Sequence, residues 1–231
     1  MNIRQRLIES IQEYDNDDRM NSFIIDEDSF SNIGYPEAFK IENLNAQKSY
    51  TAKKRYLASH LKPIGSGTGR IVYYVDNTKC IKLAKNEKGL AQNRVESQGY
   101  IQNEYSDVVA LVLSSDDNDY WHEMELAKKI SPKRFTELTG LGWQEYCWMI
   151  RCILGPNKSD YIYGTPTQEQ IDTYYEHEFA GQILHMADDL QMPAGDFQRI
   201  STYGEILRNG KAMAVLCDYG LDEHVYNDYY R

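Results

Sequence analysis

A short glycine-rich segment, set between strand-like runs, constrains the fold of this chain more than any other sequence feature. Gly65-Ser66-Gly67-Thr68-Gly69 separates the runs 61–64 and 71–75, and Asp76-Asn77-Thr78 separates the second run from 79–83. The runs are short and apolar with a period of two, which is typical of strands, and the separators are rich in turn-forming residues. The sequence therefore predicts three neighbouring antiparallel strands joined by tight turns.

Further elements extend this pattern into an α+β fold. We expect a helix across 89–103, strands at 108–114 and 120–126, and helices from Ser131-Pro132, over 143–154 and from Thr167 to about residue 190. Asn209-Gly210 is a strong hairpin signal, and it joins the runs 203–208 and 211–217. The sequence thus predicts a five-stranded antiparallel sheet with one helix, followed by a small, mostly helical part with a late β-hairpin.

The chain divides into three segments at these changes of pattern. Residues 1–60 are predicted to be an N-terminal extension, with a short helix over 3–14 and an amphipathic helix within 45–60. Residues 61–126 carry the five strands, and residues 127–231 carry the helical part.

Charge and hydropathy exclude several classes of protein. The formal net charge is −10, and residues 151–231, with 6 basic and 13 acidic side chains, contribute −7 of it. The densest basic cluster, Lys53-Lys54-Arg55, is too small for a nucleic-acid-binding patch. The longest apolar run, 108–113, is far shorter than the roughly 18 residues that a membrane-spanning helix needs. We therefore expect no nucleic-acid partner and no membrane segment.

The cysteines and the start of the chain indicate a cytoplasmic protein. None of the 4 cysteines belongs to a C-x-x-C pair, which favours reduced thiols. Residues 1–15 have mixed charge and lack the apolar core of a signal peptide.

Residues in and after the glycine segment are candidates for binding phosphate. Three glycines between 65 and 69 allow an anion to approach the backbone N–H groups closely. Lys82 shares a strand face with Cys80 and Ala84 and can reach phosphate oxygens from there. Glu96, within the predicted helix, can pair with Lys82. A glycine turn without a ligand and a solvent-facing lysine are the alternatives.

The late hairpin gathers a second set of polar residues. The turn at Asn209-Gly210 sets a register that, without a bulge, places Ser201 opposite Asp218. Asp196 lies just upstream, so two carboxylates and a hydroxyl meet at the open end of the hairpin. Such oxygen donors suit a hard cation such as Mg²⁺. Solvated acidic residues beside a turn are the alternative.

The order of these features over residues 61–220 resembles that of the protein-kinase-like superfamily. The matching residues are Gly65-x-Gly67 with Val72-Tyr73 for the glycine loop, Lys82 for the strand lysine, Glu96 for the helix glutamate, Asp196 for the catalytic aspartate and Asp218-Tyr219-Gly220 for the metal-binding Asp-Phe-Gly. The resemblance implies a two-lobed kinase-like fold, with ATP and Mg²⁺ as cofactors.

The resemblance also implies a role for each matching residue. Residues implied to bind the nucleotide are Gly65, Ser66, Gly67, Thr68, Gly69 and Lys82, together with Glu125 and Ala127 in the linker that meets adenine. Residues implied in catalysis are Lys82, Glu96 and Asp196, the last as base. Those implied to hold the metal are Asp218 and Ser201.

Several positions depart from the family pattern. Arg70 stands where the third glycine of the loop is expected, Ala194-Gly195-Asp196 replaces His-Arg-Asp, and Ser201 replaces a metal-binding asparagine. Few residues follow Gly220, which implies a compact form with a truncated C-lobe. Residues 85–93 and the Asp-Tyr-Gly sequence are similar to kinase-like proteins of bacteriophages.

Two functions follow from this pattern. The first is an ATP- and Mg²⁺-dependent phosphotransferase with Asp196 as base and Asp218 as metal ligand. The second is a catalytically inactive kinase-like module of a bacteriophage, either a virion component or a binder of a host factor. Its protein partner would bind the C-terminal tyrosines Tyr226, Tyr229 and Tyr230, or residues 1–60. Its location would be the host cytoplasm or the virion.

Overall fold

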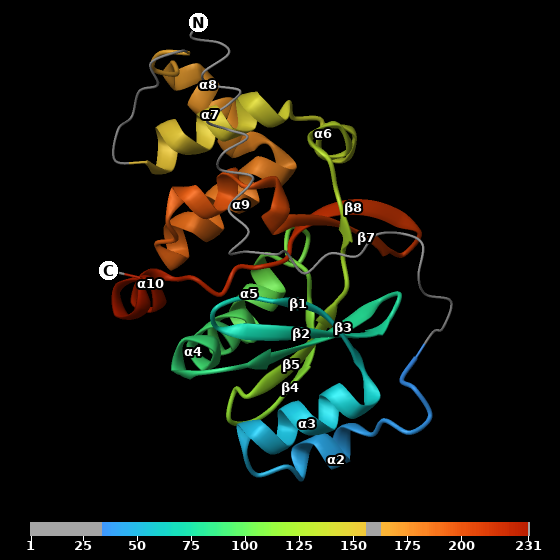
Figure 1. Ribbon diagram of the computed structural model, residues 1–231. Coiled ribbons are helices and arrows are strands. Elements are labelled where there is room, and N and C mark those ends of the chain that lie inside the picture. The colour runs from blue at the N-terminus through green and yellow to red at the C-terminus, as the bar shows by residue number, and fades with distance from the viewer. Residues whose placement is uncertain (1–33, 156–162, 231) are drawn as a thin grey trace, which may run out of the picture.

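A five-stranded antiparallel sheet and a mostly helical part make up the computed structural model, which describes residues 34–155 and 163–230 (Figure 1). A β-hairpin lies between the sheet and the helices. The α+β architecture expected from the sequence is thereby confirmed. The predicted helix over 3–14 lies outside the described residues.

The strands of the large sheet follow the order β1-β2-β3-β5-β4, and all neighbours are antiparallel. The first three form the predicted meander. The fourth is shorter than the predicted 108–114, because the backbone of 108–110 bonds to Leu216 of the hairpin instead: Leu216 N donates to Val108 O at 2.8 Å. The five strands are β1 (Lys62–Ser66), β2 (Arg70–Asp76), β3 (Lys79–Ala84), β4 (Val112–Ser115) and β5 (Trp121–Glu125).

Strand β2 is buried along its whole length, because both faces of the sheet are covered. Ile71, Tyr73 and Val75 pack with Leu44 and Leu57 of two N-terminal helices, while the alternate residues of the strand face the rest of the molecule. A helix therefore lies within the range 45–60 predicted before the sheet, and its residue Leu57 packs on the outer face. The covering helices are α2 (Ile41–Asn45) and α3 (Tyr50–His60).

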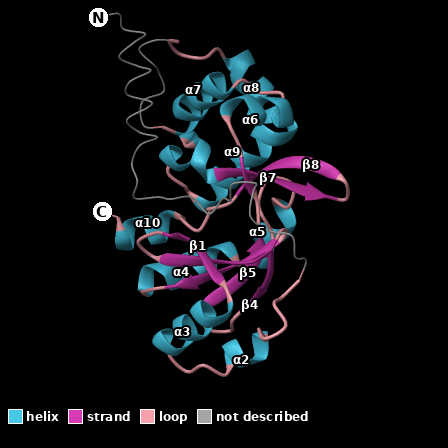
Figure 2. Cartoon of the chain, turned by 45° about the vertical axis from the view of Figure 1, so that its right-hand side comes forward, coloured by secondary structure: helices cyan, strands magenta, loops and turns pink. Residues whose placement is uncertain are grey.

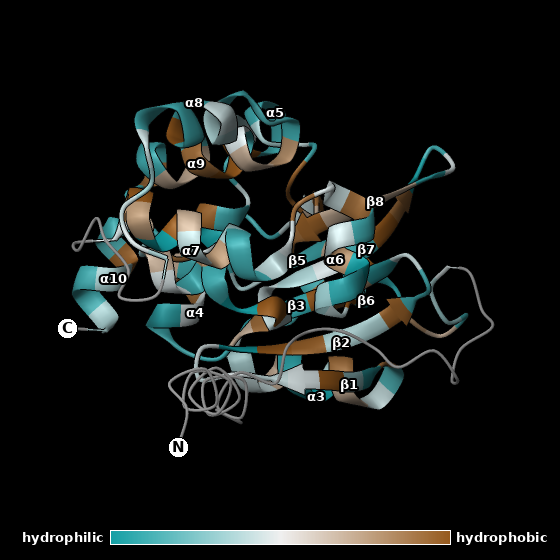
Figure 3. Ribbon diagram, turned by 90° about the horizontal axis from the view of Figure 1, so that it is seen from above, coloured by the Kyte–Doolittle hydropathy of each residue, from teal (hydrophilic) through white to brown (hydrophobic). Residues whose placement is uncertain are grey.

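Helices dominate the second half of the chain. Ser131 caps the first of them, as predicted, by accepting a hydrogen bond from Arg134 N at 3.1 Å, and Thr167 forms a capping box with Gln170. Apolar and polar residues alternate along α7 and α9, as expected of helices with one buried face (Figure 3). The helices are α6 (Pro132–Thr139), α7 (Trp143–Leu154), α8 (Gln168–Glu176), α9 (Glu178–Leu190) and α10 (Glu223–Tyr229), with the 3₁₀ helices η2 (Ala194–Gln198) and η3 (Ile200–Thr202).

A second, three-stranded sheet of order β6-β7-β8 connects the two parts (Figure 2). Its hairpin ladder runs from the pair Arg208 and Lys211 to the pair Tyr203 and Leu216 without a bulge, in the predicted register. The ladder ends there: Ser201 lies in a 3₁₀ helix, so the predicted pair of Ser201 and Asp218 is not part of it. Strand β6 and helix α10 are not predicted by the sequence pattern. The strands are β6 (Lys128–Lys129), β7 (Tyr203–Arg208) and β8 (Lys211–Leu216).

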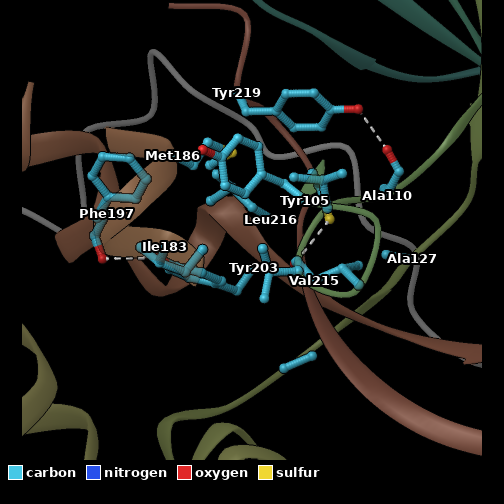
Figure 4. Packing of buried hydrophobic residues seen from close by; sticks show 14 of the residues in the cluster. Tyr105, Ala110, Ala127, Ile183, Met186, Phe197, Tyr203, Val215, Leu216 and Tyr219 are labelled. Carbon is cyan, nitrogen blue, oxygen red and sulfur yellow. Dashed lines mark hydrogen bonds between the residues drawn. The ribbon is translucent and has the colours of Figure 1, made fainter. Parts of the chain in front are cut away.

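One hydrophobic cluster runs from the inner face of the large sheet through the hairpin into the helices. The Phe135 ring contacts those of Trp143, Tyr146 and Tyr203 at centroid distances of 4.9, 5.1 and 5.4 Å. Figure 4 shows part of this cluster, in which the Tyr203 hydroxyl donates to the Phe197 carbonyl at 3.2 Å. The sheet and the helical part therefore share one core.

Two predicted helices are interrupted. The helix expected across 89–103 forms α4 (Glu87–Glu96) and α5 (Gly99–Glu104), separated where serine, glutamine and glycine follow one another. The helix expected from Thr167 ends at His177, whose Nδ1 accepts hydrogen bonds from two amides in the first turn of α9. The histidine thus caps the second helix and separates it from the first.

No helix in the described part of the chain is long and apolar enough to cross a membrane. No disulfide joins the four cysteines. Cys80, Cys152 and Cys217 are buried in the core.

The cover on the outer sheet face predicts a specific loss of stability. Leu57→Ala should lower the free energy of unfolding by about 2–5 kcal/mol, because a fully buried leucine of α3 is replaced by a cavity. Urea denaturation measures the change. The exposed neighbour Lys54 gives the matched control, and Lys54→Ala should change stability by less than about 0.5 kcal/mol. Equal effects of the two substitutions would contradict a packed α3.

Candidate functional site

The Glu96 carboxylate lies at the centre of a cluster of charged side chains and has no exposed surface. Lys82 Nζ lies 2.9 Å from its Oε2 and 3.1 Å from its Oε1, and Arg70 Nη1 lies 2.7 Å from Oε2. His122 Nε2 lies 3.1 Å from Oε2, and Tyr219 N donates to Oε1 at 3.2 Å. Burial alone would raise the pKa of Glu96, but the charges of Arg70 and Lys82 hold this pKa well below its usual value.

The strand registers explain why these side chains meet. Lys82 pairs with Val72 on one side and with His122 on the other, so their side chains share a sheet face. Arg70 lies two residues before Val72 and points to that same face. Helix α4 packs there and contributes Glu96. The pairing of Lys82 with Glu96 is confirmed, and the solvent-facing alternative is wrong because Lys82 is only 1% exposed.

The end of the hairpin reaches the same cluster. Lys82 Nζ donates to the Cys217 carbonyl at 2.7 Å, and Arg70 Nη2 forms an ion pair with Asp218. The Asp218 carboxylate remains 19% exposed. Sequence segments from β2, β3, α4 and the end of β8 therefore converge on one group of charges.

The backbone after Asp218 is fixed by two neighbouring residues. The Tyr219 hydroxyl donates to the Ala110 carbonyl at 2.7 Å (Figure 4). It also accepts from Gln102 Nε2 at 2.8 Å. A side chain at Gly220 would place its Cβ 2.6 Å from the Gln92 carbonyl oxygen, so this position requires glycine. The Asp-Tyr-Gly segment is thus held firmly against α4.

Asp196 lies on η2, near the open end of the hairpin. Burial raises the pKa of Asp196 to about 6. The positive charge of Arg199 opposes this rise, and the negative charge of Asp218 adds to it. Arg199 Nη1 lies 3.9 Å from Asp196 Oδ1. Ser201 follows in η3, partly buried.

The glycine segment lies against the start of α4. Lys85 Nζ donates to the Gly67 carbonyl at 2.6 Å, and Lys88 Nζ donates to Thr68 Oγ1 at 3.0 Å. Gly89 allows this close approach, because a Cβ there would lie 2.1 Å from the Gly69 carbonyl oxygen. Lys85, just before α4, and Lys88, in its first turn, therefore hold the glycine segment in place.

The two residues expected to meet adenine are engaged within the protein. The Glu125 carboxylate pairs with Arg208 at 2.5 Å and accepts a hydrogen bond from Leu111 N at 2.8 Å. Ala127 is 2% exposed and lies against Gly204, where an added Cβ would come within 2.5 Å of it. The structure therefore does not bring these side chains to the charged cluster.

The C-terminal helix α10 lies beside α4 (Figure 1). Lys88 Nζ lies 3.4 Å from the centroid of the Tyr230 ring, and Gln92 Nε2 donates to the Tyr230 hydroxyl at 3.4 Å. Burial raises the pKa of Tyr230 to about 12, and the charges of Asp218 and Asp196 contribute. Tyr230 therefore packs against the first half of α4.

Sequence reasoning missed two members of the cluster. Arg70 was noted as a departure from the glycine pattern, without a partner, and His122 was not singled out. Burial lowers the pKa of His122 to about 4, so its ring is neutral at pH 7. His122 lies directly across from Lys82 in the register of β3 and β5. Pairing these two strands in sequence would therefore have placed the imidazole on the same face as Lys82.

The sequence matches no protein-family model and no curated protein. Among the solved structures that are similar, two have 11% sequence identity to this chain. The gentamicin–APH(2")-IIa complex has a TM-score of 0.31 and the match covers 78% of this chain and 68% of that chain. The streptomycin–ATP–APH(2")-IIa ternary complex has a TM-score of 0.30, with 70% and 65% covered.

The buried imidazole predicts a difference in pH dependence between two proteins. His122 has a pKa of about 4 when folded and about 6.5 when unfolded, so between these values the unfolded chain binds more protons. The stability contribution of His122 is therefore lost as the pH falls from about 6.5 to 4, by up to about 1.4 kcal/mol per pH unit.

Urea denaturation of the wild-type protein and of His122→Gln across this range measures the effect. The readout is the difference between the two proteins, because Asp196, with its raised pKa, titrates in the same range with the opposite sign. The wild-type protein should lose stability more steeply on acidification. Parallel curves would contradict a buried neutral imidazole.

Proposed function

We propose that this chain is a phosphotransferase of the protein-kinase-like superfamily that uses ATP and Mg²⁺. The observation that carries the proposal is the buried contact of Lys82 with Glu96 and with the Cys217 carbonyl, one residue before Asp218. This contact fixes a cation beside a partly exposed carboxylate. In such an arrangement the lysine would bind phosphate oxygens and the aspartate would bind the metal.

Hard oxygen donors at the end of the hairpin fit Mg²⁺. Asp218 offers a carboxylate and Ser201 a hydroxyl, and both types of oxygen are ligands that Mg²⁺ accepts. Among residues 34–155 and 163–230 no group of three or more His, Cys, Asp or Glu side chains is arranged for a metal. The remaining ligands would therefore be phosphate oxygens and water. When bound, Mg²⁺ would neutralise charge on the transferred phosphate.

Asp196 would act as the base toward a hydroxyl acceptor. With a pKa of about 6 it is mostly ionised at pH 7 and still basic enough to accept a proton. The acceptor oxygen would bond to phosphorus while its proton passes to the Asp196 carboxylate and ADP leaves.

The remaining nucleotide contacts would come from the backbone. Gly65, Ser66, Gly67, Thr68 and Gly69 would lie over the phosphates. Glu125 and Ala127 would meet adenine through main-chain atoms, since the Glu125 carboxylate is already paired with Arg208.

A catalytically inactive kinase-like module is the second candidate function. The pairing of Arg70 with Asp218 favours it, because the guanidinium engages the carboxylate that a metal would need. Such a module, as a virion component or a binder of a host factor of a bacteriophage, would offer Tyr229 and Tyr230, which are 40% and 42% exposed. Residues 1–60 are the other candidate surface.

Transfer from γ-labelled ATP tests the catalytic proposal. Incubation of the purified full chain with Mg²⁺, labelled ATP and a panel of proteins and small hydroxyl compounds should label an acceptor or the chain itself. Asp196→Asn should lower the rate by at least about 100-fold through loss of the base, with nucleotide binding retained. Lys133→Ala, at an 88% exposed lysine of α6, is the control and should leave transfer unchanged. Absence of transfer with every acceptor would contradict the catalytic proposal.

Thermal unfolding with and without Mg-ATP tests the binding step separately. At a ligand concentration 100 times the Kd, binding should stabilise the folded protein by about 2.7 kcal/mol. Lys82→Ala should abolish this shift by removing the phosphate ligand, whereas Lys133→Ala should preserve it. A wild-type protein without any shift would rule out nucleotide binding.

A further inference from the structure

Arg70 holds two carboxylates at once from a fully buried position. Its side chain is 2% exposed, and its Nη2 atom lies 3.0 Å from Glu96 Oε1 while also pairing with Asp218 Oδ1. A second contact, Nη1 to Glu96 Oε2 at 2.7 Å, does not involve Asp218. The planar guanidinium has enough donors in fixed directions to serve both partners. It can therefore release Asp218 and still remain bound to Glu96.

The charges of the cluster balance without a metal. Arg70 and Lys82 supply two positive charges, Glu96 and Asp218 supply two negative charges, and the His122 ring is neutral at pH 7. A divalent cation that arrives alone at Asp218 would therefore meet a carboxylate that is already neutralised. A cation that arrives with the phosphates of a nucleotide brings compensating negative charge, which would favour release of the guanidinium.

Arg70 is also linked directly to the glycine segment. It is the first residue of β2, and its carbonyl accepts a hydrogen bond from Gly67 N at 2.9 Å. The adjacent Gly69 carbonyl accepts from Lys85 N at 2.7 Å. Any rearrangement of this loop by a bound phosphate would consequently move the backbone that carries the guanidinium.

We propose that Arg70 is an internal cation that competes with divalent metal for Asp218 and keeps the site closed until a metal-bound nucleotide displaces it. The inference rests on the proposed function, because it concerns the regulation of that same site. Competition for the carboxylate itself, however, is a property of the folded chain and can be measured with metal alone.

Manganese binding to the full chain, followed by electron paramagnetic resonance, tests the inference without nucleotide. Arg70→Gln should bind Mn²⁺ at least about tenfold more tightly than the wild-type protein, because the competing charge beside Asp218 is gone. The double variant with Asp218→Asn should lose this gain. Arg94→Gln, which removes a 69% exposed arginine of α4 paired with Asp119, is the matched control and should bind as the wild type does.

Arg70→Lys covers the case in which the glutamine variant does not fold. It keeps a positive charge for Glu96, but an ammonium group lacks the fork that reaches two carboxylates together. This variant should bind Mn²⁺ more tightly than the wild type, with a smaller gain than the glutamine variant. Circular dichroism shows which of the variants fold. If the folded Arg70 variants bind Mn²⁺ no more tightly than the wild type, the inference is overturned.

A second arm with Mn-ATP separates this inference from the proposed function. Tighter Mn²⁺ binding by the Arg70 variants without ATP binding by any protein would support the competition and contradict the phosphotransferase. Equal binding of Mn²⁺ and Mn-ATP by wild type and variants, with phosphate transfer by the wild type, would overturn the competition and support the phosphotransferase.

Discussion

Compensation of the buried Glu96 carboxylate is the interaction on which the rest of the site depends. A carboxylate without exposed surface is costly unless cations and hydrogen-bond donors surround it. Lys82 and Arg70 supply the charge, and the backbone N–H of Tyr219 supplies a further donor. Loss of either cation would leave the buried carboxylate with one compensating positive charge in place of two, so both cations contribute to its burial.

This compensation also joins parts of the chain that are distant in sequence. Arg70 and Lys82 come from the large sheet, Glu96 from α4, and Tyr219 from the segment after the hairpin. One hydrophobic cluster runs from the inner face of the large sheet through the hairpin and packs around these elements. Asp218 is partly exposed and paired with Arg70, so it is the member of the cluster that a ligand from solvent would contact first.

Much of this arrangement follows from local sequence rules, and the remainder needs the tertiary structure. The hairpin register was predictable because a two-residue turn fixes every later pair, and the face of Lys82 was predictable from strand alternation. The role of Arg70 could not be predicted in this way. Strand β2 is covered on both faces, and its sequence does not reveal which neighbouring element supplies a carboxylate to Arg70. The break at His177 depends on a side-chain cap that helix periodicity does not detect. A two-residue strand such as β6 carries no period at all.

Location of a bound metal tests the central claim most directly. The measurement is a crystal structure of the full chain with Mn²⁺ and a non-hydrolysable ATP analogue, with the metal identified by anomalous scattering. The account predicts Mn²⁺ on the Asp218 carboxylate, with Lys82 still on Glu96 and the Arg70 guanidinium moved entirely onto Glu96. An Arg70 guanidinium that stays paired with Asp218 while metal and nucleotide bind elsewhere, or do not bind, would contradict it.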